Sequence, residues 1–339
     1  MNSIFEVCGR SGVHFGRVEE LLPDLLPQGR VIVVEDRRLR ELYPSLCTEY
    51  NTILIDGGEA GKTLQTIEQI CRQLINLGAD RSTFLLAIGG GVTTDVAGFA
   101  ASIYMRGLKF GFISTTVLGQ VDASVGGKNG VNLDGYKNMV GTFTQPQFVI
   151  CDTHLLKTLS NREFRAGLAE LVKSAIIADS ALFEELEATT FEALRSDEQL
   201  LEHFIAAAVG IKSAIVSRDE REAGERRKLN LGHTLGHAIE KCSSRMNHGE
   251  AVAVGMRLIA DVGVKLGVLP STDRDRILRL LENLGFQLMP PAPIVQLLEA
   301  STKDKKNKDG DFRIILPFKI GACEVRQMTH QDFFALFTE

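Results

Sequence analysis

The chain has 339 residues, of which 44% are hydrophobic, and its formal net charge at pH 7 is −5. This length suits two domains, and no basic arm or stripe points to nucleic-acid binding. The six cysteines are far apart and show no C-x-x-C spacing, so neither a disulfide framework nor a zinc knuckle is indicated. MNSIFEVCGRSG has no signal-peptide pattern, and we find no run of about 18 apolar residues. We therefore expect a cytoplasmic protein with reduced thiols and no membrane span.

The first half of the chain alternates strand-like and helix-like segments. Leucines and isoleucines at helical spacing predict a helix over 64–77, and the glycines of TFLLAIGGG precede a second expected helix, 92–105. The expected strands are 31–36, 51–56, 83–91, 110–116 and 147–152. This alternation predicts a mostly parallel sheet with helices on both faces, hence a Rossmann-like α/β nucleotide-binding domain over residues 1–160.

The second half becomes helical from about Arg162. The expected helices are 163–178, 180–195, 198–217, 232–243, 249–267 and 272–285. Small residues are frequent in two of them, as is typical of tightly packed inner helices. Only 311–318 and 322–328 look extended. We therefore expect a mostly α-helical domain over residues 161–339.

The segment DGGEAGKT, residues 56–63, lies between a strand and a helix, where a nucleotide-phosphate loop would lie. Its spacing does not fit the P-loop pattern G-x-x-x-x-G-K-[ST], because the first glycine would fall at Asp56. If Gly57 is taken as the first glycine, the loop has one residue fewer than the P-loop pattern requires. Glu59 would also direct a carboxylate toward the phosphates. The alternative is a glycine-rich turn into a helix.

Two further glycine-rich stretches could bind anions. AIGGGVTTD, residues 87–95, leads into a helix N-terminus, although Thr94 stands where G-x-G-x-x-G has its third glycine, so a plain turn is the alternative. STTVLGQVDASVGGKNGVN, residues 114–132, could present Lys128 to a phosphate or carboxylate, and YKNMVGTF adds Lys137 and Asn138. The alternative here is a long surface loop, although loops of this length are usually functional.

LNLGHTLGHAIE, residues 229–240, gives the strongest metal signal. His233 and His237 are four residues apart, share a helical face and could bind one zinc ion. His248 and Glu170, an acid in an apolar helical segment, are further candidates, and three protein ligands are typical of catalytic zinc. Alternatively, both histidines are ordinary helix residues, or both are ligands and Glu170 is structural.

Other cationic and polar residues accompany this segment. Lys173 shares a helical face with Glu170, and Lys212, Arg226 and Asn230 also occur in this half. DKKNKDGD, residues 304–311, adds further lysines. Taken singly, each of these residues is a candidate for a solvated surface charge.

Together these segments resemble the 3-dehydroquinate synthase family of the sugar-phosphate cyclase superfamily. The resemblance covers roughly residues 30–330, and the segments occur in the family's order. They are GGEAGK, GGGVTTDVAGFAAS, STTVLGQVDASVGGKNGVN, KNMVGTF, GLAELVKSAII, LNLGHTLGHAIE, HGEAVAVGM, DKK and RIILP. The resemblance implies conversion of 3-deoxy-D-arabino-heptulosonate 7-phosphate to 3-dehydroquinate and phosphate, in the shikimate pathway of aromatic amino acid biosynthesis. It also implies catalytic NAD, a divalent metal (zinc, with cobalt as an alternative) and a homodimer.

The resemblance also implies roles for individual residues. The NAD-contacting positions are Asp36, Glu59, Lys62, Gly90, Gly91, Val92, Asp95, Thr115, Thr116, Lys128, Lys137 and the segment from Leu155 to Thr158. The metal ligands are Glu170, His233 and His248, which makes His237 a substrate-phosphate and proton-transfer residue. The substrate positions are Asp122, Lys128, Asn138, Lys173, Lys212, Arg226, Asn230 and Lys305, and Arg106 reaches the partner subunit's phosphate site. The chain departs from the family at Gly57, where the family has aspartate, and at Asn129, where it often has threonine.

Three other functions compete with this interpretation. Cyclases that make inososes or valiolones share the NAD and metal parts, but Lys212, Arg226, Asn230 and Lys305 together favour the dehydroquinate substrate. A metal-dependent polyol dehydrogenase would release NADH. A noncatalytic NAD-binding regulator would not be expected to keep its metal and phosphate residues intact.

Overall fold

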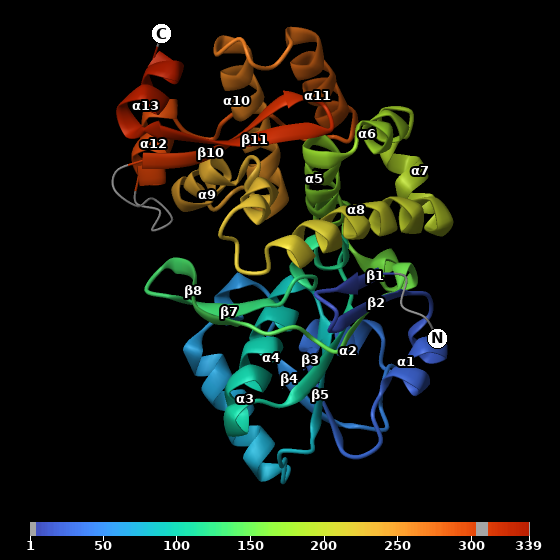
Figure 1. The fold of residues 1–339 in the computed structure, drawn as a ribbon. Coiled ribbons are helices and arrows are strands. Elements are labelled where there is room, and N and C mark those ends of the chain that lie inside the picture. Colours follow the sequence, from blue (N-terminus) through green and yellow to red (C-terminus); the bar gives the residue numbers. More distant parts are fainter. Residues whose placement is uncertain (1–4, 303–310, 339) are drawn as a thin grey trace. The chain divides into compact units, whose positions relative to one another are not determined.

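The computed structural model describes residues 5–302 and 311–338 (Figure 1), so the predicted substrate residue Lys305 lies outside the described residues. The chain forms two compact units. The first comprises Met1–Ser160 and Lys212–Arg221, and the second comprises Asn161–Ile211 and Glu222–Glu339. Lys212–Arg221 was assigned to the helical domain by sequence, whereas the fold groups it with the α/β unit.

The first unit is built on a seven-stranded sheet in the order β1-β2-β9-β6-β5-β3-β4. Its strands are β1 (Phe5–Val7), β2 (Ser11–Phe15), β3 (Val31–Asp36), β4 (Asn51–Ile55), β5 (Phe84–Gly89), β6 (Lys109–Ser114) and β9 (Phe148–Cys151). Every neighbouring pair is parallel except β1 with β2. The central strands are buried along nearly their whole length, which is why they consist of continuous apolar runs.

Helices cover both faces of this sheet. They are α1 (Val18–Leu25), α2 (Arg37–Leu42), α3 (Leu64–Asn76) and α4 (Gly91–Ile103). Alternate residues of the strands, such as Val33 and Leu86, pack in one apolar core with α1 and α2. On the other face Gly98 of α4 lies directly over the Phe112 ring, where a Cβ would be 3.0 Å from Cζ. The predicted α/β fold class is confirmed.

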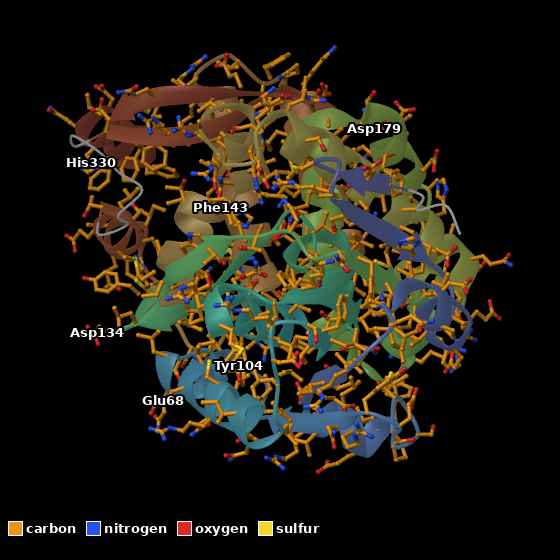
Figure 2. The ribbon with its side chains drawn as sticks, turned by 60° about the horizontal axis from the view of Figure 1, so that its bottom comes forward. Glu68, Tyr104, Asp134, Phe143, Asp179 and His330 are labelled. Atoms are coloured by element: carbon orange, nitrogen blue, oxygen red, sulfur yellow. The ribbon has the colours of Figure 1, made fainter. Side chains whose placement is uncertain are left out.

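A β-hairpin of β7 (Lys128–Leu133) and β8 (Tyr136–Phe143) forms where the sequence suggested a long loop. Asp134 and Gly135 both have positive φ, 49° and 77°, at its tight turn, and Asp134 is labelled in Figure 2. β8 is mostly exposed, so it lacks the buried apolar alternation by which strands are recognised. Isolated short helical turns connect the elements: η1 (Glu59–Gly61), η2 (Tyr104–Arg106), η3 (Gly119–Ala123) and η4 (Thr153–Thr158).

The second unit is mainly helical. Its helices are α5 (Asn161–Ala178), α6 (Ser180–Glu187), α7 (Phe191–Ser196), α9 (His233–Cys242), α10 (His248–Lys265), α11 (Ser271–Asn283), α12 (Ile294–Thr302) and α13 (His330–Thr338), together with η5 (Glu225–Asn230) and most of α8 (Glu198–Arg218). The antiparallel pair β10 (Asp311–Lys319) and β11 (Ala322–Thr329) completes it. The single helix predicted over 180–195 is two helices, because Thr190 caps the N-terminus of α7 by accepting a hydrogen bond from Ala193 N.

α8 begins in the second unit, and its residues from Lys212 onward belong to the first. Among the described residues it is the one helix long and apolar enough to cross a membrane, which the sequence analysis did not anticipate. Only half of its apolar window is buried inside the protein, but core helices pass the same test. Its length and composition are therefore weak evidence for a membrane span.

Candidate functional site

The residues predicted to contact a nucleotide follow the carboxyl ends of adjacent parallel strands. Asp36 pairs with Ile55 across β3 and β4, and Gly89 pairs with Ser114 across β5 and β6. The segments that leave these four strands therefore begin at one edge of the sheet. In open α/β sheets this edge is where ligands bind.

The turn between β5 and α4 brings backbone against neighbouring segments. A Cβ on Gly90 would be 2.8 Å from Thr116 Cγ2, and one on Gly91 would be 2.7 Å from Ala123 Cβ. Thr115 N donates to Gly89 O at 3.0 Å, which holds the next strand end beside the turn. Because α4 begins at Gly91 with no side-chain cap, the N–H groups of its first turn, with Val92 among them, are suited to an anion.

In the 56–63 segment the lysine is paired with an acid of the neighbouring helix α4. Lys62 is buried, and its Nζ lies 2.5 Å from Asp95 Oδ2 of α4. Burial raises the pKa of the Asp95 carboxyl, although the ammonium of Lys62 opposes that shift. Glu59 Oε1 accepts a hydrogen bond from Asn132 Nδ2 at 2.8 Å and lies 3.8 Å from Lys137 Nζ.

The remaining predicted nucleotide residues differ in exposure. Thr115 is buried, and Thr116 Oγ1 accepts a hydrogen bond from Gly119 N at 3.0 Å. Leu155 packs in the apolar core with α1, so its side chain is closed to a ligand. Thr158 at the end of η4 is exposed.

Two predicted substrate residues of the first unit form an ion pair. Lys212 is 5% exposed, and its Nζ donates to Asp122 Oδ1 at 2.7 Å and to Asp122 O at 2.5 Å. Lys128, at the start of β7, and Asn138, in β8 with φ 53°, are exposed. Asn129, the departure from the family's threonine, is buried and donates to Thr144 O at 2.8 Å, which ties β7 to the chain after β8.

Arg106 precedes β6 and so belongs to the opposite edge of the sheet from the nucleotide segments. It is exposed and has φ 72°, and its neighbours Met105 and Gly107 also have positive φ, 49° and 121°. Tyr104, labelled in Figure 2, anchors this turn by donating its hydroxyl hydrogen to Ala79 O at 3.2 Å. The bend presents the arginine to solvent.

In the second unit, small residues let three helices approach closely. A Cβ on Gly249 of α10 would be 2.1 Å from Ala166 O of α5, and one on Gly255 would be 2.0 Å from Gly232 O, just before α9. Gly232 itself needs the left-handed conformation, φ 77°. This packing brings the amino ends of α9 and α10 against the middle of α5.

At this junction Glu170, His233 and His248 offer one ligand atom each, all within 4.8 Å of one another. Glu170 Oε1 lies 3.5 Å from His233 Nε2 and 3.2 Å from His248 Nε2. His233 Nδ1 faces Leu231 O at 3.0 Å, and His248 Nδ1 faces Glu240 Oε1 at 3.3 Å. With both Nδ1 atoms donating to oxygen, both Nε2 atoms can act as ligands.

The electrostatics of this cluster suit a cation. Burial alone would raise the pKa of Glu170, but the Lys173 ammonium paired with it and the two imidazoles hold that pKa well below its ordinary value. Burial lowers the pKa of His233 to about 3, so its imidazole is neutral, the form that binds metal. Although burial opposes the shift, hydrogen bonds to Glu170 and Glu240 raise the pKa of His248 to about 10.

His237 lies beside this donor set without contributing a ligand atom to it. Its ring centroid is 5.4 Å from that of His233 and 6.3 Å from that of His248. The geometry therefore favours Glu170, His233 and His248 over joint ligation by the two α9 histidines. Arg226 is buried in η5, outside that set.

Two acidic residues that contact predicted site residues were not predicted from the sequence. Glu240 orients His248, as described above, and Glu222 Oε1 accepts a hydrogen bond from Asn230 Nδ2 at 2.5 Å. Glu240 lies on α9 seven residues after His233, about two helical turns away, a spacing that could have signalled it. Glu222 has φ 60° in a charged turn, and no sequence pattern points to it.

Residues 52–166 match the family model for the 3-dehydroquinate synthase N-terminal region, and residues 167–307 match that for its C-terminal region. A 3-dehydroquinate synthase of Halorhodospira halophila is 44% identical over 312 residues, covering 90% of this chain and 88% of that protein. One of Rhodopseudomonas palustris is 40% identical over 339 residues, covering 93% and 89% of the two chains.

Among solved structures, the 2-epi-5-epi-valiolone synthase ValA of Streptomyces hygroscopicus with bound NAD+ and Zn2+ superposes with a TM-score of 0.89. It is 28% identical, and the match covers 99% of this chain and 98% of that one. A 2-deoxy-scyllo-inosose synthase with carbaglucose-6-phosphate, NAD+ and Co2+ gives a TM-score of 0.86 at 28% identity, covering 98% of each chain. From its sequence matches and its fold, the chain belongs to the 3-dehydroquinate synthase family.

Proposed function

We propose that the protein is a 3-dehydroquinate synthase, a phosphate-eliminating lyase of the shikimate pathway that uses catalytic NAD and a divalent metal. Its substrate would be 3-deoxy-D-arabino-heptulosonate 7-phosphate, and its products 3-dehydroquinate and phosphate. The observation that carries this proposal is the donor set of Glu170, His233 and His248, the first two buried and the third half-buried, in a chain 44% identical to a named relative.

The donor set fits zinc, or cobalt as in one structural relative. Two imidazole nitrogens and one carboxylate oxygen within 4.8 Å are a three-ligand set of the kind that catalytic zinc uses. The NAD segments also fit: Gly90 and Gly91 have no room for a Cβ, and an uncapped helix begins there. When bound, NAD supplies a reversible hydride acceptor, and the metal supplies a Lewis acid.

The chain's own residues would position the reactants. Lys173 keeps Glu170 ionised and so able to hold the metal. Lys212, held by Asp122, and buried Arg226 are preorganised cations suited to the substrate carboxylate. His237, half-buried beside the donor set, would hold the substrate phosphate and carry a proton.

Further residues complete the proposed roles. Lys128, Asn138 and Lys305, together with Arg106 of the partner in a homodimer, would bind the phosphate, and Asn230 would bind the substrate. Several chemical steps would occur while the substrate stays bound in one orientation. Much of the catalysis would therefore depend on such positioning.

Sequence identity to the relatives separates the competing functions. Glycerol dehydrogenase and iron-containing alcohol dehydrogenase structures share the fold at 16% identity, which supports the fold alone. Inosose and valiolone cyclases are 28% identical, below the 40–44% of the named dehydroquinate synthases.

The decisive experiment supplies the heptulosonate phosphate with substoichiometric NAD and assays both products. Equal phosphate and dehydroquinate, with no net NADH, are expected; dialysis against a chelator should abolish turnover, and zinc or cobalt should restore it. Stoichiometric NADH would overturn the proposal in favour of a dehydrogenase, and phosphate release from a different sugar phosphate alone would favour another cyclase.

A further inference from the structure

Asn129 is the buried residue next to Lys128 at the end of the β7–β8 hairpin away from its turn. There Lys128 pairs with Phe143, labelled in Figure 2, and Asn129 pairs with Thr142. Successive strand residues point to opposite faces, so Lys128 and Phe143 are exposed whereas Asn129 is only 5% exposed. A slip of one residue in the strand would therefore turn Lys128 inward and Asn129 outward.

The Asn129 amide donates both of its hydrogens to backbone carbonyls near Lys128. Nδ2 donates to Gly127 O at 3.1 Å and to Thr144 O at 2.8 Å. Gly127 O also accepts a hydrogen bond from Thr144 N at 2.8 Å. One side chain thus joins the residue before Lys128 to the residue after Phe143, beyond the last pair of the strand ladder.

Gly98 of α4 provides the space for this amide. A Cβ on Gly98 would lie 2.2 Å from Asn129 Oδ1 and 2.7 Å from Asn129 Cγ. Gly91, at the start of α4, is seven residues earlier, so it lies on the same face about two turns away. The amide therefore packs the base of the hairpin against the helix whose first turn is suited to an anion.

Gln145 covers the other side of the turn that precedes Lys128. Gly127 in that turn has φ 70°, and a Cβ on it would lie 2.7 Å from Gln145 Cδ. Gln145 Nε2 donates to Glu220 Oε1 at 2.9 Å, and Arg10 Nη2 lies 2.6 Å from the same oxygen. The backbone that leads into Lys128 is thus held on both sides within the first unit.

We propose, resting on the function proposed above, that Asn129 is a positioning residue for Lys128. Its amide fixes the register that exposes the lysine and the backbone from which the lysine side chain extends toward the phosphate-bearing substrate. A threonine, which the family often has here, carries one O–H donor and could bond only one of the two carbonyls. The chain therefore holds Lys128 by a pair of contacts that the family's common residue does not provide.

The test is a double-mutant cycle on kcat/KM for the heptulosonate phosphate, measured as phosphate release at saturating NAD. Asn129→Asp is nearly isosteric, but it removes both donors and sets a carboxylate against two carbonyl oxygens. It should lower kcat/KM about tenfold or more when Lys128 is present. In a Lys128→Ala background it should change kcat/KM less than about twofold, because the group that it positions is absent. Micromolar enzyme keeps the slow Lys128→Ala variants measurable.

Thr83→Val is the matched control for the loss of buried hydrogen bonds in the same unit. Thr83 is buried just before β5, where its Oγ1 accepts a hydrogen bond from Asp80 N at 3.0 Å. This variant should melt at a lower temperature and keep kcat/KM within about twofold in both backgrounds. Equal losses from Asn129→Asp with and without Lys128 would show a purely structural role and overturn the inference, as would an unchanged kcat/KM.

If Asn129→Asp does not fold, Asn129→Thr replaces it in the cycle, because the family often has threonine at this position. With at most one of the two hydrogen bonds left, it should lower kcat/KM several-fold, again only when Lys128 is present. No loss, or an equal loss in both backgrounds, overturns the inference. The proposed function is judged separately, because it fails only if wild type makes no dehydroquinate.

Discussion

The close contact of α10 with α5 makes Gly249→Ala a sharp test of how the metal donors are held. The new Cβ would lie 2.1 Å from Ala166 O, whereas an ordinary carbon-to-oxygen contact is about 3.3 Å. The difference of about 1.2 Å must be met by backbone movement, because the obstructing atom is a carbonyl oxygen. His248 is the adjacent residue, and metal–ligand distances tolerate only about 0.2 Å.

We expect overpacking to cost about 2–3 kcal/mol and the helical preference of alanine to return about 1 kcal/mol, a net loss of about 1–2 kcal/mol. Zinc affinity should fall more than tenfold, because mutations that disturb the residues orienting metal ligands typically weaken metal binding by at least about that factor. The assays are competition with a chromophoric chelator and thermal unfolding of the full-length protein.

Gly236→Ala on α9 is the matched control. Its Cβ would be 3.3 Å from Val252 Cα, a contact that a shift of a few tenths of an ångström relieves. It should keep wild-type stability and zinc affinity within about threefold, since the helical gain offsets the small strain. Wild-type zinc affinity in Gly249→Ala, or equal losses in the two variants, would refute this reasoning.

His233→Ala should lose zinc while His237→Ala keeps it, measured as metal content of the purified variants; equal loss in both would show joint ligation. Zinc binding at pH 7.5 should release about one proton, since the pKa of His248 is raised to about 10. Affinity should then fall about tenfold per pH unit as pH decreases below that pKa, and calorimetry in buffers of different ionisation enthalpy that finds no proton release would contradict this. If Arg106 acts in the partner's site, mixed dimers of Arg106→Ala and Lys128→Ala subunits should recover up to about half of wild-type activity per dimer. No recovery despite confirmed subunit exchange would assign Arg106 to its own subunit or outside the chemistry.

Much of the fold was predictable because the pattern of apolar residues along the chain indicates most of its helices and strands. β3 is buried on both faces, and β5 is buried throughout, so each reads as an unbroken apolar run. The β7–β8 hairpin was missed because its side chains are largely exposed and glycine and asparagine are frequent in it. Its strands are specified by the turn at Asp134 and Gly135 and by pairing, which periodicity does not report.

The metal centre was predictable only in part from residue types. The spacing of His233 and His237 shows that they share a face, but not that His233 Nε2 lies 3.5 Å from Glu170 Oε1 and joins the donor set. That choice depends on where α10 places His248, and so on tertiary packing between segments far apart in sequence. Likewise, a Cβ on Gly57 would lie 2.0 Å from Asp36 Oδ2, and this close approach depends on strand register, which the residues at those positions do not encode by themselves.

The small residues that gave α5 and α10 the pattern of tightly packed inner helices have a chemical consequence. A carboxylate as deeply buried as Glu170 is costly unless cations surround it, and Lys173 and the imidazoles can do so only at short range. Bulkier residues at Gly249 or Gly255 would move His248 and His233 away from Glu170, leaving Lys173 of its own helix as the cation beside that charge. The glycines therefore affect the pKa of His248, which its contact with Glu170 raises, as well as the geometry of the donor set, and substitutions there should alter metal binding before they unfold the unit.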